Sequence, residues 1–355
     1  MTTPILIVAD DLTGALDSAA PFASRGLHVR VALGVDAVAE AAAAAPDVLA
    51  IDTRSRNLSP LLAAARVEAA WSAAQALAPR LVMKKIDSRL KGEVAAETAA
   101  LLAASGRSSA IACPAVLEQE RKVTGGRLTG RGVGAPLTVA GHFGGLPCEC
   151  PDAADEADLA AIARTILDAP DRIVAVGARG LASALASLIA GAPQDASSLV
   201  PALPMVIAIG STDPITIAQV ERLRLDCPQI VELPASTAAS SGSRDPVILL
   251  LRGAGRAGSD PIAATARFGR EVAALVRATS ARTILCSGGA TAAAVMEALG
   301  ARQLVPEHEL DPGVPVARIE GTDGIRLITK SGGFGDPGVL SRIARHAIGL
   351  GQVAV

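Results

Sequence analysis

The sequence contains very few aromatic residues, with one Trp, four Phe and no Tyr among 355 residues. Proteins bind single-stranded nucleic acids by stacking bases on aromatic side chains, and this composition offers no such platform. Its 33 basic and 35 acidic residues leave a net charge of −2, so the basic excess that attracts phosphate backbones is also missing. We therefore expect no nucleic-acid partner.

Paired cysteines and long apolar runs are missing as well. Five cysteines without paired spacing are typical of a reducing compartment, and Cys148-Glu149-Cys150 lacks a second ligand pair, so we expect no protein metal site. No segment reaches the roughly 18 apolar residues of a membrane helix. Residues 1–4 lead directly into a predicted strand, without room for a signal peptide. We expect a cytoplasmic protein with no membrane partner.

Half of the residues are hydrophobic, and short aliphatic runs alternate with long Ala-rich amphipathic stretches. In the first half this pattern predicts strands at Ile5–Ala9, Val48–Asp52, Leu81–Lys84, Ala110–Cys113 and Ile173–Val176. It predicts helices at Gly14–Ser24, Ser59–Leu77, Gly92–Ala104, Glu156–Leu167 and Leu181–Ile189. Such alternation indicates a parallel sheet covered by helices on both faces.

The length of the chain favours two domains, and two irregular segments interrupt the pattern. Thr124–Pro151 is rich in Gly and Pro, which predicts a flap or hairpin over the first crevice. Gly191–Pro204 is loose, and strands and helices begin to alternate afresh at Met205. We predict an α/β protein with domains at 1–195 and 205–355, each a mainly parallel sheet flanked by helices, with the active site in the cleft between them.

Strands in the first half end on polar or charged residues. The ends read Asp10-Asp11-Leu12-Thr13-Gly14, Asp52-Thr53-Arg54-Ser55-Arg56, Lys84-Lys85-Ile86-Asp87-Ser88-Arg89 and Cys113-Pro114. In an open parallel sheet, ligands bind in the crevice outside the carboxyl ends of the strands. The first domain is therefore predicted to bind a small polar molecule.

Strands in the second half end instead on glycine and hydroxyl residues. These loops are Gly210–Pro214, Ser287–Thr291 and Lys330–Asp336, and each opens a predicted helix. Helix N-termini direct backbone N–H groups and a partial positive charge at a ligand, which favours a polyphosphate site. Glycine also turns strands into helices, and Asp213-Pro214 can be a plain helix cap. The glycines that follow Lys330 exceed what a turn needs.

Gly253-Ala254-Gly255-Arg256-Ala257-Gly258 fits the pattern G-x-G-x-x-G of dinucleotide-binding proteins. It lies in the middle of the second domain, however, and no acidic residue closes the next predicted strand, which ends at Cys286-Ser287. An NAD-dependent enzyme is therefore a weaker alternative.

Four motifs together resemble the four-carbon acid sugar kinases, in order and over nearly the whole chain. They are Asp10-Asp11-Leu12-Thr13-Gly14-Ala15-Leu16-Asp17, Lys85-Ile86-Asp87-Ser88 with Leu90-Lys91-Gly92, Ser287-Gly288-Gly289, and Thr329-Lys330-Ser331-Gly332-Gly333-Phe334-Gly335. The resemblance implies an ATP-dependent kinase for acids such as threonate, erythronate or their 3-oxo relatives. It also implies that the first domain binds the acid and the second binds ATP.

A kinase of this kind needs a carboxylate that accepts the proton of the attacked hydroxyl, and Asp11 and Asp87 are the two candidates for this catalytic role. The candidate substrate-binding residues are Asp10, Thr13, Arg54, Lys85, Ser88, Arg89, Lys91, Gln119 and Arg121, in which the planar Arg side chains suit a carboxylate. The candidate ATP-binding residues are Ser211, Ser287, Gly288, Gly289, Thr291, Lys330, Ser331, Gly332, Gly333, Phe334 and Gly335. Mg²⁺ is expected to accompany ATP, mostly with water ligands.

The chain departs from the family pattern at several positions. Arg89, Ala290 and Asp213 stand where Thr, Glu and Ser are common, and the stretch after Pro136 is shorter. A catalytically silent nucleotide or metabolite sensor of the same fold is therefore an alternative. The oligomeric state stays open, with a homodimer as one option.

Overall fold

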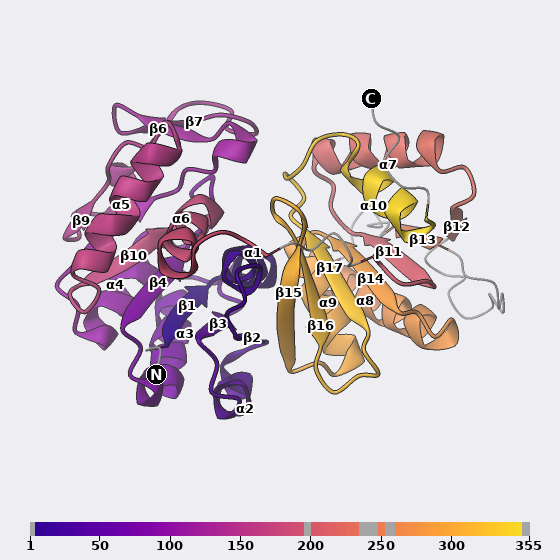
Figure 1. The fold of residues 1–355 in the computed structure, drawn as a ribbon, viewed down its shortest axis with the longest axis horizontal. Helices are drawn as coiled ribbons and strands as arrows, with labels where there is room; N and C mark the ends of the chain where they lie inside the picture. Colours follow the sequence, from indigo (N-terminus) through magenta and orange to yellow (C-terminus); the bar gives the residue numbers. More distant parts are fainter. Residues whose placement is uncertain (1–3, 195–199, 234–247, 253–259, 350–355) are drawn as a thin grey trace. The chain divides into compact units, whose positions relative to one another are not determined.

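The structure, a computed structural model, describes residues 4–194, 200–233, 248–252 and 260–349. The chain divides into two compact units, Met1–Gln194 and Asp195–Val355. Each is built on a mostly parallel sheet with helices packed against it, which confirms the predicted α/β class and its two domains (Figure 1). Within the described ranges, no helix has the length and apolarity that crossing a membrane requires.

The sheet of the first unit is parallel throughout. Its strands are β1 (Ile5–Ala9), β2 (Val29–Ala32), β3 (Val48–Asp52), β4 (Leu81–Lys85), β5 (Ser109–Cys113), β9 (Cys148–Glu149) and β10 (Ile173–Gly177). They lie side by side in the order β2-β3-β1-β4-β10-β5-β9. Side chains on both faces of β1 and β3 are buried, as expected where helices cover both faces of a parallel sheet.

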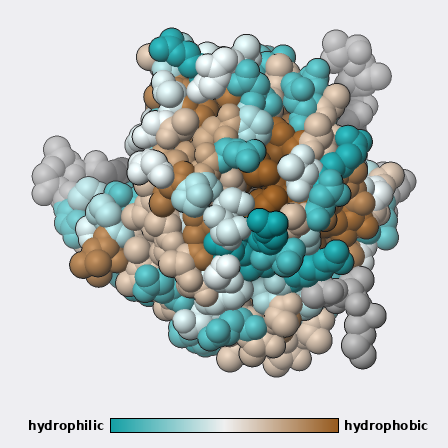
Figure 2. Space-filling model, turned by 90° about the vertical axis from the view of Figure 1, so that its left-hand side faces the viewer, coloured by the Kyte–Doolittle hydropathy of each residue, from teal (hydrophilic) through white to brown (hydrophobic). Residues whose placement is uncertain are grey.

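The helices of this unit form two groups. They are α1 (Leu12–Ala23), α2 (Val38–Ala43), α3 (Pro60–Ala74), α4 (Val94–Ser105), α5 (Glu156–Asp168) and α6 (Arg179–Ala190). Helix α6 packs against α1 and α5, and α3 packs against α2 and α4 (Figure 1). The surface on the left of Figure 1, seen face-on in Figure 2, intersperses hydrophilic with hydrophobic residues.

Trp71, the single Trp of the sequence, lies on α3. The guanidinium carbon of Arg107 lies 5.8 Å from the centre of a Trp71 ring. Arg107 also donates hydrogen bonds to the carbonyl oxygens of Pro170 and Pro79, at 3.1 and 3.0 Å. This cation therefore fixes the tryptophan within the first unit.

The predicted flap contains a hairpin of β6 (Lys122–Thr124) and β7 (Arg127–Thr129), to which β8 (Leu137–Thr138) adds a third antiparallel strand. The predicted hairpin is thus confirmed. Val123, Leu128 and Phe143 are buried within the segment. These few apolar side chains give a Gly-rich segment a small core of its own.

The second unit has a mixed sheet. Its strands are β11 (Met205–Ile209), β12 (Val231–Leu233), β13 (Ile248–Arg252), β14 (Thr283–Ser287), β15 (Gln303–Asp311), β16 (Val314–Ile319) and β17 (Arg326–Lys330). Strands β12-β13-β11-β14-β17 are parallel in that order, and β16 and β15 follow antiparallel beside β17. The sequence analysis did not anticipate this antiparallel pair.

The helices of the second unit are α7 (Pro214–Asp226), α8 (Pro261–Ala278), α9 (Gly289–Leu299) and α10 (Val339–Ala347). Helix α7 packs against α10, and α8 packs against α9. Aliphatic side chains of β11, β17 and α10 form one buried cluster, which includes Ile207, Ile328 and Leu340. This core fixes the strand ends from which the predicted phosphate loops emerge.

Candidate active site

The loops of the first unit meet at the topological switch point of its sheet. From β1 the chain proceeds to β2 and β3 on one side and then to β4, β5 and β10 on the other, so β1 and β4 flank the switch point. Ala9 is in register with Asp52 of β3 and with Lys85 of β4. The loops that follow therefore leave the sheet at one level, where α/β proteins bind ligands.

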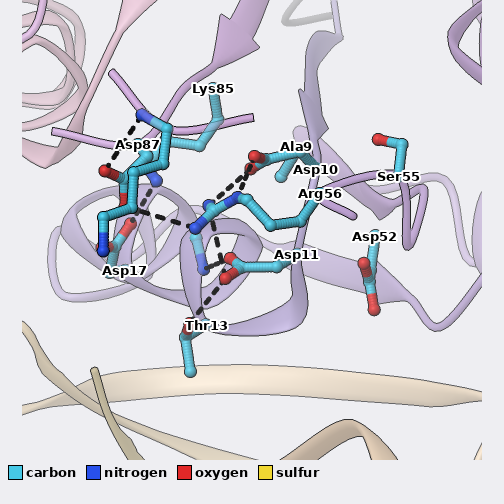
Figure 3. Close-up of polar contacts among 12 residues, drawn as sticks. Ala9, Asp10, Asp11, Thr13, Asp17, Asp52, Ser55, Arg56, Lys85 and Asp87 are labelled. Atoms are coloured by element: carbon cyan, nitrogen blue, oxygen red, sulfur yellow. Dashed lines mark hydrogen bonds and ion pairs between the residues drawn. The ribbon is translucent and has the colours of Figure 1, made fainter. Parts of the chain in front are cut away.

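Arg56 lies at the centre of three carboxylates in this crevice (Figure 3). Its Nε and Nη2 donate to Asp10, with Nη2 2.8 Å from Oδ1. Nη2 also lies 3.3 Å from Asp11 Oδ2, and Nη1 lies 3.2 Å from Asp87 Oδ2. One guanidinium group thereby joins the loops that follow β1, β3 and β4.

Solvent exposure separates the roles of these three carboxylates. The side chain of Asp10 is 2% exposed, whereas those of Asp11 and Asp87 are 23% and 16% exposed. Burial acts to raise the pKa of Asp10, but the charges of Arg56 and the nearby lysines outweigh it and lower that pKa. Asp10 therefore anchors Arg56, while Asp11 and Asp87 can reach a ligand.

Asp11 is held by the start of α1. As the N-cap residue, its Oδ1 accepts from the backbone N–H of Gly14 at 2.6 Å, and its Oδ2 accepts from Thr13 Oγ1 at 3.3 Å. A Cβ atom at Gly14 would lie 2.7 Å from both Asp11 Oδ1 and Lys85 Nζ. Glycine at this position therefore allows the carboxylate and the ammonium group to converge.

Asp87 is oriented by the turn after β4. Its Oδ1 accepts from the backbone N–H groups of Arg89 and Lys91, at 2.9 and 3.4 Å, which leaves Oδ2 directed at Arg56. The Lys91 side chain is exposed. A carboxylate fixed by two backbone donors keeps its position when a ligand binds.

Lys85 and Asp17 form a buried pair beside the cluster, with Lys85 Nζ 3.8 Å from Asp17 Oδ1. Burial acts to lower the pKa of Lys85, but Asp17, Asp11 and Asp10 outweigh it and raise that pKa. Burial raises the pKa of Asp17 to about 6, against the opposing charge of Lys85. The lysine therefore stays positively charged at neutral pH.

A second polar network lies entirely beneath these loops. Lys84 Nζ lies 2.9 Å from Glu97 Oε2 and donates to the carbonyl oxygen of Lys85 at 2.8 Å. Ser55 Oγ donates to the other oxygen of Glu97. The side chains of Lys84, Glu97 and Ser55 are buried, so this network fixes the loops rather than contacting a ligand.

Two arginines converge near the hairpin. Arg121 is buried and donates to Ser88 Oγ at 2.7 Å and to the carbonyl oxygen of Arg131 at 2.8 Å. A Cβ atom at Gly132 would lie 3.3 Å from Arg89 Nη1 and 3.4 Å from Arg121 Nη2. The guanidinium groups of Arg89 and Arg121 thus approach the same point beside Gly132, and Arg121 also reaches the hydroxyl of Ser88.

Two further predicted substrate residues lie differently. Arg54 Nη2 donates to the carbonyl oxygen of Leu33 at 3.2 Å, so Arg54 points towards the chain after β2 and not into the Arg56 cluster. Gln119 is buried, and its Oε1 atom has no hydrogen-bond partner in the described part of the chain. An acceptor buried without a partner is costly, and a ligand hydroxyl could satisfy it.

The glycine loops of the second unit are packed tightly against one another. Ile209 of β11 is in register with Ser287 of β14, which in turn is in register with Lys330 of β17. A Cβ atom at Gly332 would overlap the hydroxyl of Ser211, and one at Gly288 would lie 3.5 Å from Ser211 Cβ. Strands β11 and β14 flank the switch point of this sheet, as β1 and β4 do in the first.

The N-termini of α7 and α9 directly follow two of these loops. Asp213 caps α7 through the backbone N–H of Ile215 at 3.0 Å, as the plain capping alternative predicted. Helix α9 begins at Gly289 with no side-chain cap, directly after the loop at Gly288. Its first N–H groups are therefore suited to hydrogen-bond an anion.

Several predicted ATP-binding residues lie inside the second unit. Lys330 and Ser287 are fully buried, and Thr291 is 4% exposed. The ring of Phe334 is buried against Gly313, where a Cβ atom would overlap it. These side chains shape the loops from within, which leaves backbone groups to face a ligand. The motif at residues 253–258 lies outside the described residues.

Sequence analysis missed Arg56, Asp17 and Glu97. Arg56 and Asp17 stand within the quoted motifs, but nothing in the spacing singled them out. Glu97 is the acidic residue in the first turn of the Ala-rich helix α4. Glu97 is a charged residue in a helix that is otherwise almost wholly apolar. That contrast could have identified it as a buried, paired carboxylate.

Known proteins resemble both halves of the chain. Residues 5–142 match the family model described as a sugar-binding N-terminal domain, and residues 252–340 match a nucleotide-binding C-terminal domain. A crystal structure from Salmonella typhimurium described as a putative tRNA synthase has the same fold, with a TM-score of 0.77, 19% identity and coverage of 98% of this chain and 100% of that one.

The curated relatives span the whole chain. A D-threonate kinase of Bordetella bronchiseptica is 31% identical over 96% of each chain, and one of Cupriavidus necator is 32% identical over 94% of this chain and 96% of its own. A 3-oxo-tetronate kinase of Cupriavidus necator is 27% identical over 96% of each chain. The alignment with the Bordetella kinase has 399 positions, and this chain has 355 residues, so this chain has no residue at 44 or more of those positions. With this identity over nearly its full length, and with both domain models matched, the chain belongs to the four-carbon acid sugar kinase family.

Proposed function

We propose that this protein transfers the γ-phosphoryl group of ATP to a hydroxyl of a small four-carbon sugar acid. The observation that carries the proposal is the pair of partly exposed carboxylates, Asp11 and Asp87, which Arg56 holds at the switch point of the first sheet. This site lies in the unit that matches a sugar-binding domain. The kinases named among its relatives support the same reaction class.

The first unit offers a hydroxyl site and an anion site next to each other. Beside Arg56, Asp11 and Asp87 each hold a partly exposed carboxyl group, which can accept the proton of a bound hydroxyl. Arg89 and Arg121 converge beside Gly132, where their planar groups suit the carboxylate of the acid. Thr13, Ser88, Lys85 and Gln119 are the further polar groups proposed to contact the acid.

Asp11 and Asp87 are the proposed bases, and Asp10 is assigned the structural role. Phosphoryl transfer depends mainly on positioning and charge neutralisation, so the base must be fixed and ionised. Backbone donors and Arg56 fix the positions of Asp11 and Asp87. The hydroxyl oxygen of the acid attacks the γ-phosphorus and its proton passes to one of these carboxylates. The bond between the γ-phosphorus and the bridging oxygen breaks, and ADP leaves.

The second unit is the proposed ATP site, formed by the loops at Ser211, at Gly288 and Gly289, and at residues 331–335. Mg²⁺ fits this arrangement as a partner of the phosphates, because Arg56 already occupies the space among the three carboxylates of the first unit. Bound Mg²⁺ would neutralise part of the phosphate charge. Backbone N–H groups of the loops orient the phosphates.

The experiment that tests this function is ADP release from Mg-ATP with a panel of four-carbon acids. The panel contains D- and L-threonate, D-erythronate and their 3-oxo forms, and a reaction without acid is the control. We expect turnover that depends on one of these acids. ATP binding without turnover on any acid would contradict the proposal and would support the silent sensor instead.

A further inference from the structure

Lys330 is the last residue of β17, and its side chain is fully buried beneath the glycine loop that follows. Its Nζ donates to the carbonyl oxygens of Ser331 and Phe334, at 2.8 and 3.1 Å. The carbonyl oxygen of Gly332 and the hydroxyl of Thr216 each lie 3.4 Å from Nζ. The ammonium group is thus surrounded by oxygens of the loop it precedes.

Helix α7 supplies two more donors to the same side of the loop. Thr216 Oγ1 donates to the carbonyl oxygen of Gly332 at 2.8 Å. Gln219 Nε2 donates to the carbonyl oxygens of Phe334 and Asp336, at 3.0 and 2.9 Å. Carbonyl groups along residues 331–336 therefore point inward, towards Lys330 and α7.

The direction of these carbonyl groups fixes the direction of the N–H groups that follow. In a planar trans peptide the C=O and N–H bonds point to opposite sides. Inward carbonyls at Ser331 and Phe334 therefore turn the N–H groups of Gly332 and Gly335 outward, and both of these glycines are partly exposed. Outward N–H groups of a loop can donate hydrogen bonds to a bound anion.

We propose that Lys330 is a positioning residue for nucleotide binding, whose ammonium group holds the loop carbonyls inward from beneath and so presents the N–H groups of Gly332 and Gly335 to the phosphates. This inference rests on the proposed function, because it requires that the second unit binds ATP. The sequence analysis expected Lys330 to contact the nucleotide directly. We infer instead that Lys330 acts by positioning the loop that contacts it.

The charge of Lys330, and with it the proposed effect on ATP binding, depends on pH. Burial lowers the pKa of Lys330 to about 7, and the charge of Asp213 at the start of α7 opposes that effect. Asp336, at the far end of the loop, pairs with Arg342 at 2.6 Å. The thiol of Cys286 in the neighbouring β14 has its pKa raised to about 12 by burial and stays neutral.

Bound phosphates would raise the pKa of Lys330, since they add negative charge above the loop. Binding of nucleotide and binding of a proton then favour each other. Between pH 7.5 and 9.5 the phosphates of ATP are almost fully ionised, since the last proton of a terminal phosphate has a pKa of about 6. Loss of ATP affinity with rising pH in that range would therefore report the ammonium group.

The test measures ATP affinity by calorimetry on the full chain at pH 7.5, 8.5 and 9.5, for wild type, Lys330→Met and Thr216→Val. We expect wild-type affinity to fall with pH, by up to about tenfold per unit. We expect Lys330→Met to bind at least about tenfold more weakly at pH 7.5 and to show a flat profile. Thr216→Val removes a neighbouring donor without removing the charge, so its affinity should fall less and keep the pH dependence.

The outcomes separate this inference from the proposed function. A flat wild-type profile, or equal affinities of wild type and Lys330→Met, would overturn the role of Lys330 and leave the kinase proposal intact. Absence of ATP binding by the folded wild type would overturn both. The wild-type profile decides the question even if Lys330→Met does not fold.

Discussion

Three aspartates with the same side chain acquire different roles through their surroundings. Asp10 is buried against Arg56, while Asp11 and Asp87 each keep part of their surface exposed beside the same guanidinium. Burial with a partner makes a carboxylate structural, and partial exposure makes it available to a substrate. The sequence places Asp10 and Asp11 side by side, so this distinction depends on the direction in which each side chain leaves the loop.

Asp11→Asn and Asp87→Asn test which carboxylate accepts the proton. Asn still caps a helix, so Asp11→Asn should leave α1 intact while removing the base. We expect the variant that lacks the base to lose roughly 10²- to 10⁴-fold in kcat, with ATP affinity nearly unchanged. Steady-state kinetics and ATP calorimetry measure the two quantities. Wild-type turnover in both variants would exclude both aspartates.

Arg56→Met tests the cluster through its effect on stability. Asp10 has a lowered pKa in the folded wild type. Its contribution to the free energy of unfolding is therefore complete above about pH 4 and is lost only as pH falls through the folded pKa. Without Arg56, burial raises that pKa, and the variant should gain stability as pH falls from 7 towards 4. We expect a destabilisation of about 3–5 kcal/mol at pH 7, and a smaller difference in stability from the wild type at pH 5.

Thermal unfolding at both pH values measures this change. Arg131→Met is the matched control, since Arg131 forms an exposed pair with Glu120. The control should change stability by less than about 1 kcal/mol at either pH. If wild type and Arg56→Met differed in stability by the same amount at pH 7 and pH 5, the proposed charge balance around Asp10 would be wrong.

At the scale of elements, Gly14 couples the first turn of α1 to the site. Alanine favours a helix by about 0.5–1 kcal/mol over glycine, so Gly14→Ala should not destabilise α1 itself. Its methyl group would displace Asp11 and Lys85, however. We therefore expect at least a tenfold loss of kcat/KM, with stability lowered by about 1 kcal/mol at most through the weakened Asp11 cap.

Gly134→Ala is the control for this substitution, because a Cβ atom there would meet nothing within 4 Å. Its activity and melting temperature should match those of the wild type. Full activity of Gly14→Ala would show that Asp11 and Lys85 can move apart without consequence, and would weaken their assignment to the site.

Elements with continuous aliphatic runs could be predicted from sequence, and irregular loops could not. The predicted strand at Ile5–Ala9 is β1 without change, because five buried apolar residues in succession leave few alternatives. In the loop after β3, Arg54 adopts a left-handed φ of 52° and turns towards Leu33, whereas Arg56 enters the site. Sequence spacing contains no information about such a local turn.

The antiparallel pair of β15 and β16 was not predicted from the sequence, and the hairpin was predicted without the bounds of its strands. Strands β15 and β16 mix buried and partly exposed positions, and β15 includes irregular register, so neither shows a clean period of two. The hairpin of β6 and β7 is only three residues long on each side. Pairing between strands stabilises these segments more than local propensity does.

At the scale of the whole molecule, two units with separate proposed ligands predict separable responses. Arg89→Met should abolish the rise in melting temperature caused by the sugar acid and keep the rise caused by ATP. A ligand at 100 times its Kd stabilises the unit that binds it by about 2.7 kcal/mol. Arg131→Met again serves as control and should keep both responses. Loss of the ATP response in Arg89→Met would contradict the assignment of the two ligands.

The scarcity of aromatic residues gives each unit a different optical signature. Trp71 is the single Trp, it lies on α3 beside Arg107, and the sequence contains no Tyr to contribute emission. Intrinsic fluorescence therefore observes the first unit alone, while circular dichroism observes the helices of both. Where the two signals diverge during denaturation, their difference measures the stability of the second unit in the intact chain, without a label or a truncated protein.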